Sequence, residues 1–447
     1  MTDDNGTGVP ASDEPRRHGV RGEIDPVVIT GVGAISALGT GAEELNSRWQ
    51  AGEVGIEDGF GAASSFDPAN WLTNKQQRRT DRFSQFAVAA ADEAVGQAGW
   101  EDSLGGYDPA RVACLIGSGI GGLATLEWQF GVLFDRGASA LSPLAIPLLM
   151  PNAAAATVAM RLGTHGPAFA TTSACAAGAN AIGTASQLIR SGVVDAAIAG
   201  GSEAAMTRFS KGAFGQMSAL SESGISRPFD ARRDGFVLGE GAGVFVLERE
   251  SSARARGATI LGRLLGYAST VDAHHITAPA PDGRWAALAM TNALADAGLT
   301  PEQVDYVNAH GTSTELNDVV EAGALRTALG DRAGRIPVSS LKSAVGHLLG
   351  ASGAVEAVAT VLALRDGVAP PNLGYAEPDP EVALDIVVGE PRALRTRVPA
   401  AVGAAAPASN GHVASAERPL VALSNSFGFG GHNAVLALEG PDGGDAS

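Results

Sequence analysis

The sequence predicts an α/β protein with largely buried sheets. Short apolar runs at 26–30, 112–116 and 194–199 each lead into glycine-rich sequence, which is typical of strands that are buried on both faces. Ala- and Leu-rich stretches of helical length, at 82–99 and 174–191, lie between these runs. Strands that alternate with helices at this spacing indicate an α/β architecture.

The alternation starts again after about residue 260, which indicates two similar halves. We place the halves at 24–259 and 260–440. A further strand of the first half is expected at 243–247. The expected elements of the second half are helices at 284–298, 316–329 and 350–365 and strands at 304–308, 420–424 and 433–438. Composition predicts disordered tails at 1–23 and 441–447 and a surface loop at 398–417.

Charge and composition exclude several classes of function. The chain has 447 residues and a formal net charge of −17, so it is a poor candidate for binding nucleic acid or an anionic membrane. Two cysteines cannot form a disulfide framework, which favours a reducing compartment and a cytoplasmic protein. The polar N-terminus shows no secretory signal. The apolar stretch 143–160 contains Pro and Asn, and we expect a buried helical segment there rather than a membrane span.

The glycine-rich motif GSGIGG at 117–122 follows a predicted strand and fits a dinucleotide-binding template. That template requires an acidic residue about 20 positions further on, at the end of a second strand. Glu127 is too near, and 137–142 reads GASALS. We therefore interpret the glycines as a tight turn against neighbouring backbone.

Cys175 lies in TTSACAAGAN, where all the nearby side chains are small. An extended stretch precedes it, and a helix that should stop at Gly192 follows it. At the start of a helix, free N–H groups and the dipole favour a negative charge, which would lower the pKa of a thiol. Position alone leaves two interpretations open, a catalytic thiol or an inert buried one.

Two of the eight histidines favour the catalytic interpretation. His310 lies in NAHGTST and His347 in KSAVGHLLGASGA, both beside glycine at expected strand ends. Lys342 lies five residues before His347. One Cys with two such His is a constellation that suits acyl-thioester chemistry. The remaining histidines are interpreted as structural: His18, His165, His274, His275, His412 and His432.

Five long motifs together resemble one family. They are TTSACAAGA, RPFDARRDGFVLGEGAG (227–243), YVNAHGTSTELND (306–318), SSLKSAVGHLLGASGAVEA (339–357) and SNSFGFGGHN (424–433). From about Val27 to about Leu438 the chain resembles the elongating β-ketoacyl-acyl-carrier-protein synthases of type II fatty acid synthesis, similar to β-ketoacyl synthase II. The resemblance implies a thiolase fold, with duplicated βαβαβαββ halves in five layers (α-β-α-β-α), and a homodimer.

The resemblance also implies a reaction and roles for individual residues. Cys175 would accept an acyl chain from acyl carrier protein, and His310 and His347 would bind the malonyl thioester carbonyl during decarboxylation. Attack on the acyl-cysteine would give a β-ketoacyl product two carbons longer, as part of fatty acid biosynthesis. Lys342 and Glu356 would support the histidines. Phe429 would act as a gate, and its N–H would form the oxyanion hole with that of Cys175.

Further residues are expected to bind substrate. By resemblance, Phe214 and Phe427 would contact the acyl chain, and Thr312 and Thr314 the phosphopantetheine arm. No cofactor is required, because the substrates arrive on the phosphopantetheine of the carrier. A monovalent cation is expected near Asn308, Glu356 and Asn425.

Carrier docking is where the sequence departs from the family pattern. Lys75, Arg78 and Arg79 match a basic cluster that would bind the acidic carrier. Elsewhere Arg136 stands alone where relatives carry more basic residues, and Ser218 replaces a family arginine. Arg208 and Lys211 are candidates to compensate.

The sequence disfavours three related classes of protein and leaves one open. A thiolase would need a second catalytic cysteine, which Cys114 does not supply. Primer-initiating synthases pair Cys with His and Asn, and His347 in GHLLG speaks against that class. A non-catalytic partner of the chain-length-factor type usually lacks the cysteine that this chain retains as Cys175. A ketosynthase of a type II polyketide or another specialised pathway stays open, because only the depth of the acyl pocket would separate it from a fatty acid enzyme.

Overall fold

The structure is a computed structural model that describes residues 25–101, 103–394 and 418–442. The predicted tail 1–23, the predicted loop 398–417 and residues 443–447 of the second tail lie outside the described residues. Within the described residues, no helix is both long enough and apolar enough to cross a membrane.

The first half forms a mixed sheet whose strand order is β5-β4-β6-β8-β1. Its strands are β1 (Val27–Ser36), β4 (Val112–Gly117), β5 (Ala168–Phe169), β6 (Ala196–Glu203) and β8 (Gly241–Arg249). β5, β4 and β6 run parallel, whereas β6, β8 and β1 are antiparallel neighbours. The predicted strands of this half are therefore present, with shifted ends.

The second half repeats this order as β11-β10-β15-β16-β9. Its strands are β9 (Gly262–Val271), β10 (Tyr306–Asn308), β11 (Pro337–Ser339), β15 (Val421–Gly428) and β16 (His432–Glu439). The pattern of parallel and antiparallel neighbours is also the same, which confirms the duplication. β1 also pairs with β9, so the two sheets are continuous along the edge where these strands meet. In the part of the chain that the structure describes, no break in the sheet marks a boundary, and the division at residue 259/260 stays a prediction.

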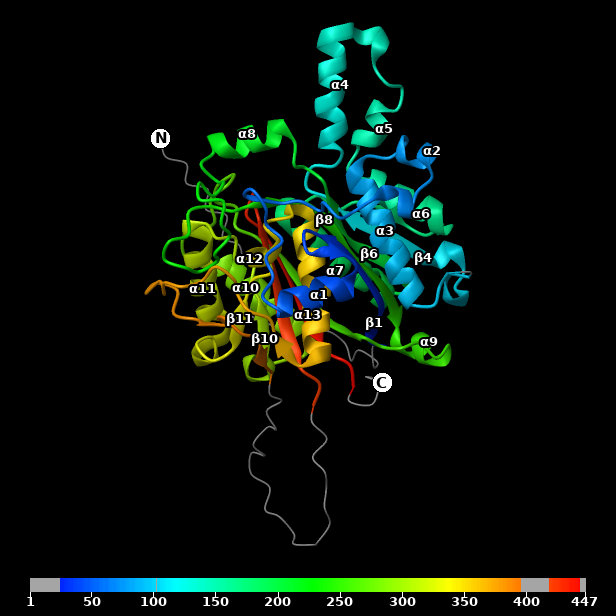
Figure 1. Ribbon diagram of the computed structural model, residues 1–447. Coiled ribbons are helices and arrows are strands. Elements are labelled where there is room, and N and C mark those ends of the chain that lie inside the picture. Colours follow the sequence, from blue (N-terminus) through cyan, green and yellow to red (C-terminus); the bar gives the residue numbers. More distant parts are fainter. Residues whose placement is uncertain (1–24, 102, 395–417, 443–447) are drawn as a thin grey trace, which may run out of the picture.

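Helices separate and cover the two sheets, as Figure 1 shows. They are α3 (Arg82–Gln97), α6 (Ala153–Leu162), α7 (Ala177–Arg190), α10 (Arg284–Ala297), α11 (Glu315–Leu329) and α13 (Ser352–Asp366). α7 and α13 pack against strands of both sheets. α3 covers the outer face of the first sheet with α6, and α10 covers the second with α11. The order is therefore α-β-α-β-α, as predicted.

The central helix α13 is buried around its whole circumference. Every residue from Ser352 to Leu364 is buried, because the sequence SGAVEAVATVLAL places apolar or small side chains on all faces, with Glu356 as the one charged residue. Close packing on the outer side of the first sheet depends on glycine. A Cβ at Gly31 of β1 would lie 1.9 Å from the carbonyl oxygen of Ala94 in α3. This packing brings α3 close against β1 on the outer face of the first sheet.

The remaining elements are short or peripheral. The helices are α1 (Ala42–Gln50), α2 (Asn74–Gln77), α4 (Leu123–Arg136), α5 (Ala145–Leu149), α8 (Arg208–Gln216), α9 (Glu250–Ala255) and α12 (Lys342–Val345). The strands are β2 (Gly39–Thr40), β3 (Phe60–Gly61), β7 (Leu238–Gly239), β12 (Val368–Ala369), β13 (Asp385–Ile386) and β14 (Arg392–Ala393).

The prediction of one buried helical segment at 143–160 is wrong. The segment forms α5 and α6, and Met150 between them is extended because a residue before proline, here Pro151, disfavours the helical conformation. α4 and α5 project from the body of the molecule (Figure 1). Ile146 is 64% exposed and Phe134 on α4 is 80% exposed, so this projection presents apolar side chains to its surroundings.

Candidate active site

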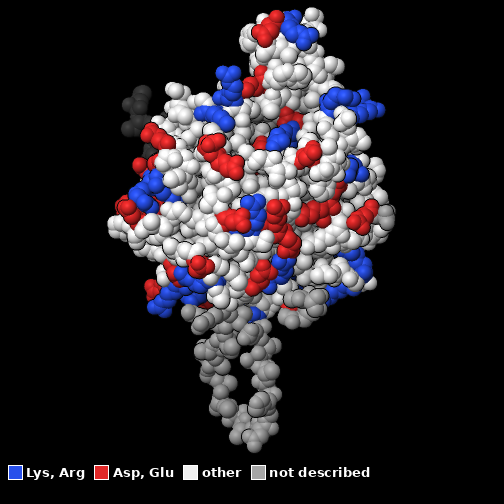
Figure 2. Space-filling view, in the orientation of Figure 1, with Lys and Arg blue, Asp and Glu red and all other residues white. Residues whose placement is uncertain are grey.

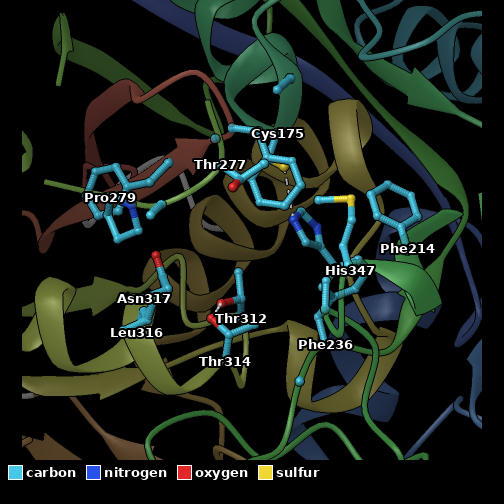
Figure 3. Close-up of a pocket in the computed structure, with 18 of the residues that line it drawn as sticks. Cys175, Phe214, Phe236, Thr277, Pro279, Thr312, Thr314, Leu316, Asn317 and His347 are labelled. Atoms are coloured by element: carbon cyan, nitrogen blue, oxygen red, sulfur yellow. Dashed lines mark hydrogen bonds between the residues drawn. The ribbon is translucent and has the colours of Figure 1, made fainter. Parts of the chain in front are cut away.

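A cavity of about 950 Å³ brings together side chains from both halves of the chain. Cys175 comes from the first half, and His310 and His347 come from the second. Figure 3 shows Cys175 and His347 pointing toward each other inside this cavity. The cysteine and the two histidines named from the sequence therefore lie at one place.

Cys175 lies in a short 3₁₀ turn, Ala174–Ala176, directly ahead of α7. Ala174 is in the left-handed region, with φ of 49°. α7 ends as expected, with Gly192 at a φ of 78° just beyond it. A non-glycine residue held in this region stores strain, a feature that clusters at active sites.

The predicted lowering of the thiol pKa is wrong. Burial raises the pKa of Cys175 to about 11, although the charge of Lys342 and a backbone hydrogen bond from Phe429 act in the opposite direction. Because side chains and turns from the second half close over the helix start, desolvation outweighs the favourable position. The thiol is therefore protonated at neutral pH in this state.

His347 presents a fixed nitrogen to the thiol. Its Nε2 lies 3.1 Å from the Sγ of Cys175. The backbone N–H of Leu349 donates to its Nδ1 over 3.2 Å, so Nδ1 is an acceptor and a neutral ring carries its proton on Nε2. The hydroxyl of Ser352, 2.9 Å from Nδ1, is placed to donate as well.

His310 is fixed in the same tautomer by a different donor. The Nζ of Lys342 lies 3.2 Å from Nδ1 of His310 and donates to the carbonyl oxygen of the same residue at 2.6 Å. Lys342 also forms a buried ion pair with Glu356. Since an ammonium group only donates, the Nδ1 of His310 accepts and Nε2 carries the proton.

Both imidazoles are neutral at physiological pH. Burial, reinforced by the charge of Lys342, lowers the pKa of His310 and of His347 well below the usual value. The two ring centroids are 5.5 Å apart. Two neutral N–H donors at this separation suit the stabilisation of negative charge on one substrate oxygen.

The backbone of the FGFGG segment lies against the nucleophile. A Cβ at Gly428 would be 2.9 Å from the backbone nitrogen of Cys175, so only glycine permits this approach. Phe429 lines the cavity, and its backbone N–H bonds to the thiol. The N–H groups of Phe429 and Cys175 are therefore close neighbours, as the predicted oxyanion hole requires.

The cavity walls contain the expected substrate-binding residues and one that sequence reasoning missed. Phe214 and Phe427 line the cavity, and the hydroxyl oxygens of Thr312 and Thr314 are 2.8 Å apart in its wall. Phe236 was missed, although it lies within the RPFDARRDGFVLGEGAG motif. Its ring centroid is 5.4 Å from that of Phe214 and 5.3 Å from that of His347.

Three side chains fit the predicted cation. Among the described residues, the Oδ1 atoms of Asn308 and Asn425 and the Oε2 atom of Glu356 are buried and have no hydrogen-bond partner. Oxygen ligands of this kind suit a hard cation. Asn308 and Asn425 lie on the paired strands β10 and β15, where Asn308 is opposite Ser424.

The predicted docking residues lie away from the cavity group. Lys75, Arg78 and Arg79 are exposed in and just after α2. Figure 2 shows basic side chains gathered in this region, at the upper right. Arg136 is exposed at the end of α4, and the Nζ of Lys211 lies 3.6 Å from the centroid of the Phe60 ring.

The other described histidines lie apart from this cavity. His165, His274 and His275 are exposed and His432 is half-buried, and none of them lines this cavity. His18 and His412 lie outside the described residues.

Two family profiles match most of the chain. The β-ketoacyl synthase N-terminal domain matches residues 50–253, and the β-ketoacyl synthase C-terminal domain matches residues 261–376. A protein of Synechocystis named 3-oxoacyl-[acyl-carrier-protein] synthase 2 is 44% identical, over 92% of this chain and 97% of its own length.

Solved structures give the same result. The ishigamide ketosynthase/chain length factor has a TM-score of 0.82 and 32% identity, covering 93% of this chain and 99% of that one. A type II polyketide ketosynthase (AntDE), solved with its acyl-carrier protein (AntF) and bound to the hexaketide, has a TM-score of 0.81 and 29% identity, with coverage of 94% and 100%. These likenesses confirm the predicted thiolase fold.

Proposed function

Because the chain belongs to the β-ketoacyl synthase family, we propose that it catalyses the decarboxylative condensation of an acyl chain with malonyl-acyl carrier protein. The product is a β-ketoacyl-acyl carrier protein that is two carbons longer, and the pathway is fatty acid biosynthesis. The observation that carries this proposal is the 3.1 Å contact between the Sγ of Cys175 and the Nε2 of His347, with His310 beside them.

The first step transfers the acyl chain to the enzyme. The sulfur of Cys175 attacks the thioester carbonyl, the bond to the phosphopantetheine sulfur breaks, and the departing thiol gains the proton that Cys175 loses. The N–H groups of Cys175 and Phe429 stabilise the tetrahedral oxyanion. Thr312 and Thr314 hold the phosphopantetheine arm, and Phe214 and Phe427 contact the chain.

The second step makes the carbon–carbon bond. Breakage of the bond to the malonyl carboxylate releases carbon dioxide and leaves its electron pair as an enolate. The Nε2–H groups of His310 and His347 donate to the enolate oxygen, where the negative charge develops. The enolate carbon attacks the acyl-cysteine, the carbon–sulfur bond to Cys175 breaks, and the released thiolate takes a proton from water.

The reaction requires no cofactor, since the malonyl carboxylate supplies the electron pair. A monovalent cation bound by Asn308, Glu356 and Asn425 would give the unpartnered oxygens of these residues a ligand. Such a cation would hold β10 and β15 at the site rather than take part in bond making.

Acyl carrier protein is the proposed partner. The chain is strongly acidic overall, so an acidic carrier needs a local basic surface, which Lys75, Arg78 and Arg79 provide. The solved ketosynthase in complex with its acyl-carrier protein supports this partnership.

We place the enzyme in the cytoplasm as a homodimer. Both cysteines, Cys114 and Cys175, are free and buried, in keeping with a reducing compartment. β5 is a sheet edge whose Phe169 is 38% exposed, and α6 packs against both β5 and α5 of the apolar projection. A second copy that paired at β5 would cover both surfaces.

A ketosynthase of a type II polyketide pathway is the second candidate, supported by the structural neighbours. The higher identity to a 3-oxoacyl-[acyl-carrier-protein] synthase 2 favours the fatty acid role. A non-catalytic chain-length-factor-like partner is disfavoured by the complete group of Cys175, His310 and His347. A scan of acyl-carrier primers of increasing length, read by product mass, separates the first two candidates.

The direct test is Cys175→Ala. We expect no mass increase on the protein after incubation with acyl carrier protein and no condensation product. Cys114→Ala is the matched control, since its thiol is buried against Ala155 and away from the cavity. Condensation by Cys175→Ala would exclude the proposed mechanism.

A further inference from the structure

Glu203, at the end of β6, is a buried carboxylate that the proposed reaction does not use. It is 0% exposed, and among the described residues its hydrogen bonds come from backbone N–H groups and one hydroxyl rather than from a Lys or Arg side chain. Burial raises its pKa to about 7, although several hydrogen bonds oppose this shift. A carboxylate kept in such a place at a cost in stability has a structural or functional reason.

Five donors converge on this carboxylate. Oε2 accepts the N–H of Gly119 at 2.7 Å and that of Gly350 at 3.1 Å. Oε1 accepts the hydroxyl of Ser118 at 3.0 Å and the N–H groups of Gly121 at 3.3 Å and Ile120 at 3.4 Å. The GSGIGG motif thus surrounds an internal anion, in the way that such loops surround a phosphate.

The same carboxylate joins two turns that border the catalytic cavity. Gly119 and Ile120 line the cavity from the first half, and Leu349, which precedes Gly350, lines it from the second. The turns touch directly, since a Cβ at Gly350 would lie 2.2 Å from the backbone nitrogen of Gly119. This contact confirms the interpretation of the glycines as a tight turn against neighbouring backbone.

The position of Gly350 matters because of its neighbour. The N–H of Leu349 fixes the tautomer of His347, and Leu349 has a φ of 48°, a strained conformation for a non-glycine residue. A bond from Gly350 to Glu203 holds the peptide that follows Leu349. Release of this bond would let the turn relax and move the Leu349 N–H away from His347.

We propose that Glu203 is a positioning residue of the condensing site, whose carboxylate clamps the 118–121 turn to the 349–350 turn and so keeps the Nε2–H of His347 directed at the substrate oxygen. This inference rests on the proposed roles of Cys175 and His347. It adds a residue that touches neither substrate nor nucleophile and acts through the backbone.

Glu203→Gln is the sharpest variant, because it keeps the size of the side chain and changes only its acceptors. An amide has one oxygen, and its NH₂ group would face N–H donors at the other position. Either the Gly119–Gly350 pair or the Ser118–Ile120–Gly121 group then loses its acceptor. We expect kcat for condensation to fall at least about tenfold, and KM for malonyl-acyl carrier protein to stay within about threefold.

Acylation of Cys175 is measured separately by intact mass, and we expect its rate in Glu203→Gln to stay within about threefold of wild type. The matched control is Glu248→Gln, another carboxylate with 0% exposure. Glu248 on β8 lies opposite Ala196, the first residue of β6, whereas Glu203 is its last residue. At about 3.3 Å per residue, the two ends of β6 are about 23 Å apart. The Glu248→Gln control should therefore lower the unfolding midpoint and leave kcat unchanged.

An unchanged kcat in Glu203→Gln would overturn the proposal, as would an equal loss of acylation and condensation. If Glu203→Gln does not fold, Ser118→Ala removes one donor and leaves the backbone intact, and it should lower kcat about threefold with KM unchanged. Unchanged kcat in that variant would then overturn the proposal. Failure of wild-type enzyme to form acyl-Cys175 would instead contradict the proposed function.

Discussion

The Nζ of Lys342 lies 3.2 Å from the Nδ1 of His310, and this contact sets which nitrogen of the ring carries the proton. Lysine has three donors and no acceptor, so it forces Nδ1 to accept. The same amino group pairs with Glu356 and bonds to the His310 carbonyl, and these contacts fix its position. Burial lowers the pKa of His310 and of His347, and the charge of Lys342 adds to this shift, which keeps both rings neutral.

Replacement of Lys342 by Met should therefore lower activity and stability for different reasons. It leaves Glu356 buried without its cation, which costs about 3–5 kcal/mol of unfolding free energy. The double variant Lys342→Met/Glu356→Gln should regain much of this stability, but its kcat should stay low because His310 lacks its donor. Denaturant unfolding and steady-state kinetics measure the two effects. Recovery of kcat in the double variant would contradict a role for the Lys342–His310 contact.

Loss of His347 should separate the two half-reactions. In His347→Ala we expect acylation of Cys175 within about threefold of wild type and condensation lowered by about 10²–10³, the usual effect of removing one oxyanion donor. The reason is that Nε2 carries a proton and so donates to the enolate rather than taking the proton of the thiol. Intact mass reports acylation, and product formation reports condensation.

His165→Ala, which changes an exposed histidine, is the control. Equal loss of both half-reactions would show that His347 acts on the thiol.

Reversal of charge at Arg78 should weaken carrier docking without touching the chemistry. For Arg78→Glu we expect KM for acyl carrier protein to rise about tenfold at low salt, with kcat unchanged. The difference from wild type should shrink as salt screens the interaction. Arg335→Glu is the matched control, an exposed arginine just before β11 and outside the cavity lining. An equal rise in KM for both variants would indicate a general charge effect rather than a docking site.

Glu321 predicts a pH dependence of stability. Its carboxylate accepts the N–H groups of His310 and Gly311, and burial raises its pKa to about 7 from 4.5. Between these values the folded protein binds more protons than the unfolded chain, so this residue makes stability fall as pH rises from about 4.5 to about 7. The change is up to about 3 kcal/mol.

Unfolding free energies of wild type and Glu321→Gln, measured across this pH range, check the prediction. The wild-type protein should lose stability relative to the variant as pH rises, since the variant has no group to titrate at that position. A constant difference between the two proteins would contradict the raised pKa.

Local sequence patterns predicted most elements of the fold, because an apolar strand or an Ala-rich helix is determined largely by residues that are close together in the sequence. The split of 143–160 was missed, although Pro151 marked it. β9 was also missed, because GRLLGYASTV mixes apolar with small and polar residues and its pairing partners, β1 and β16, come from distant parts of the chain.

Motifs predicted that Cys175, His310 and His347 lie together, whereas the pKa shifts of these side chains could not be predicted. The helix start favours a low thiol pKa, but the groups that bury Cys175 come from turns more than 170 residues away along the chain. The contacts of Glu203 could not be predicted either, since nothing in GGSE indicates that its carboxylate reaches the GSGIGG turn. Long-range contacts of this kind depend on the assembled halves.

The strained turns ahead of α7 and α13 are counterparts in the duplicated fold. Ala174 and Leu349 have φ angles of 49° and 48°, and each precedes the central residue of a 3₁₀ turn, Cys175 in one copy and Gly350 in the other. The two halves thus carry the same strained backbone turn at equivalent places, with different side chains. One turn carries Cys175, the proposed acyl acceptor, and the other supplies the N–H that binds Nδ1 of His347, so the proposed site needs both halves of the chain.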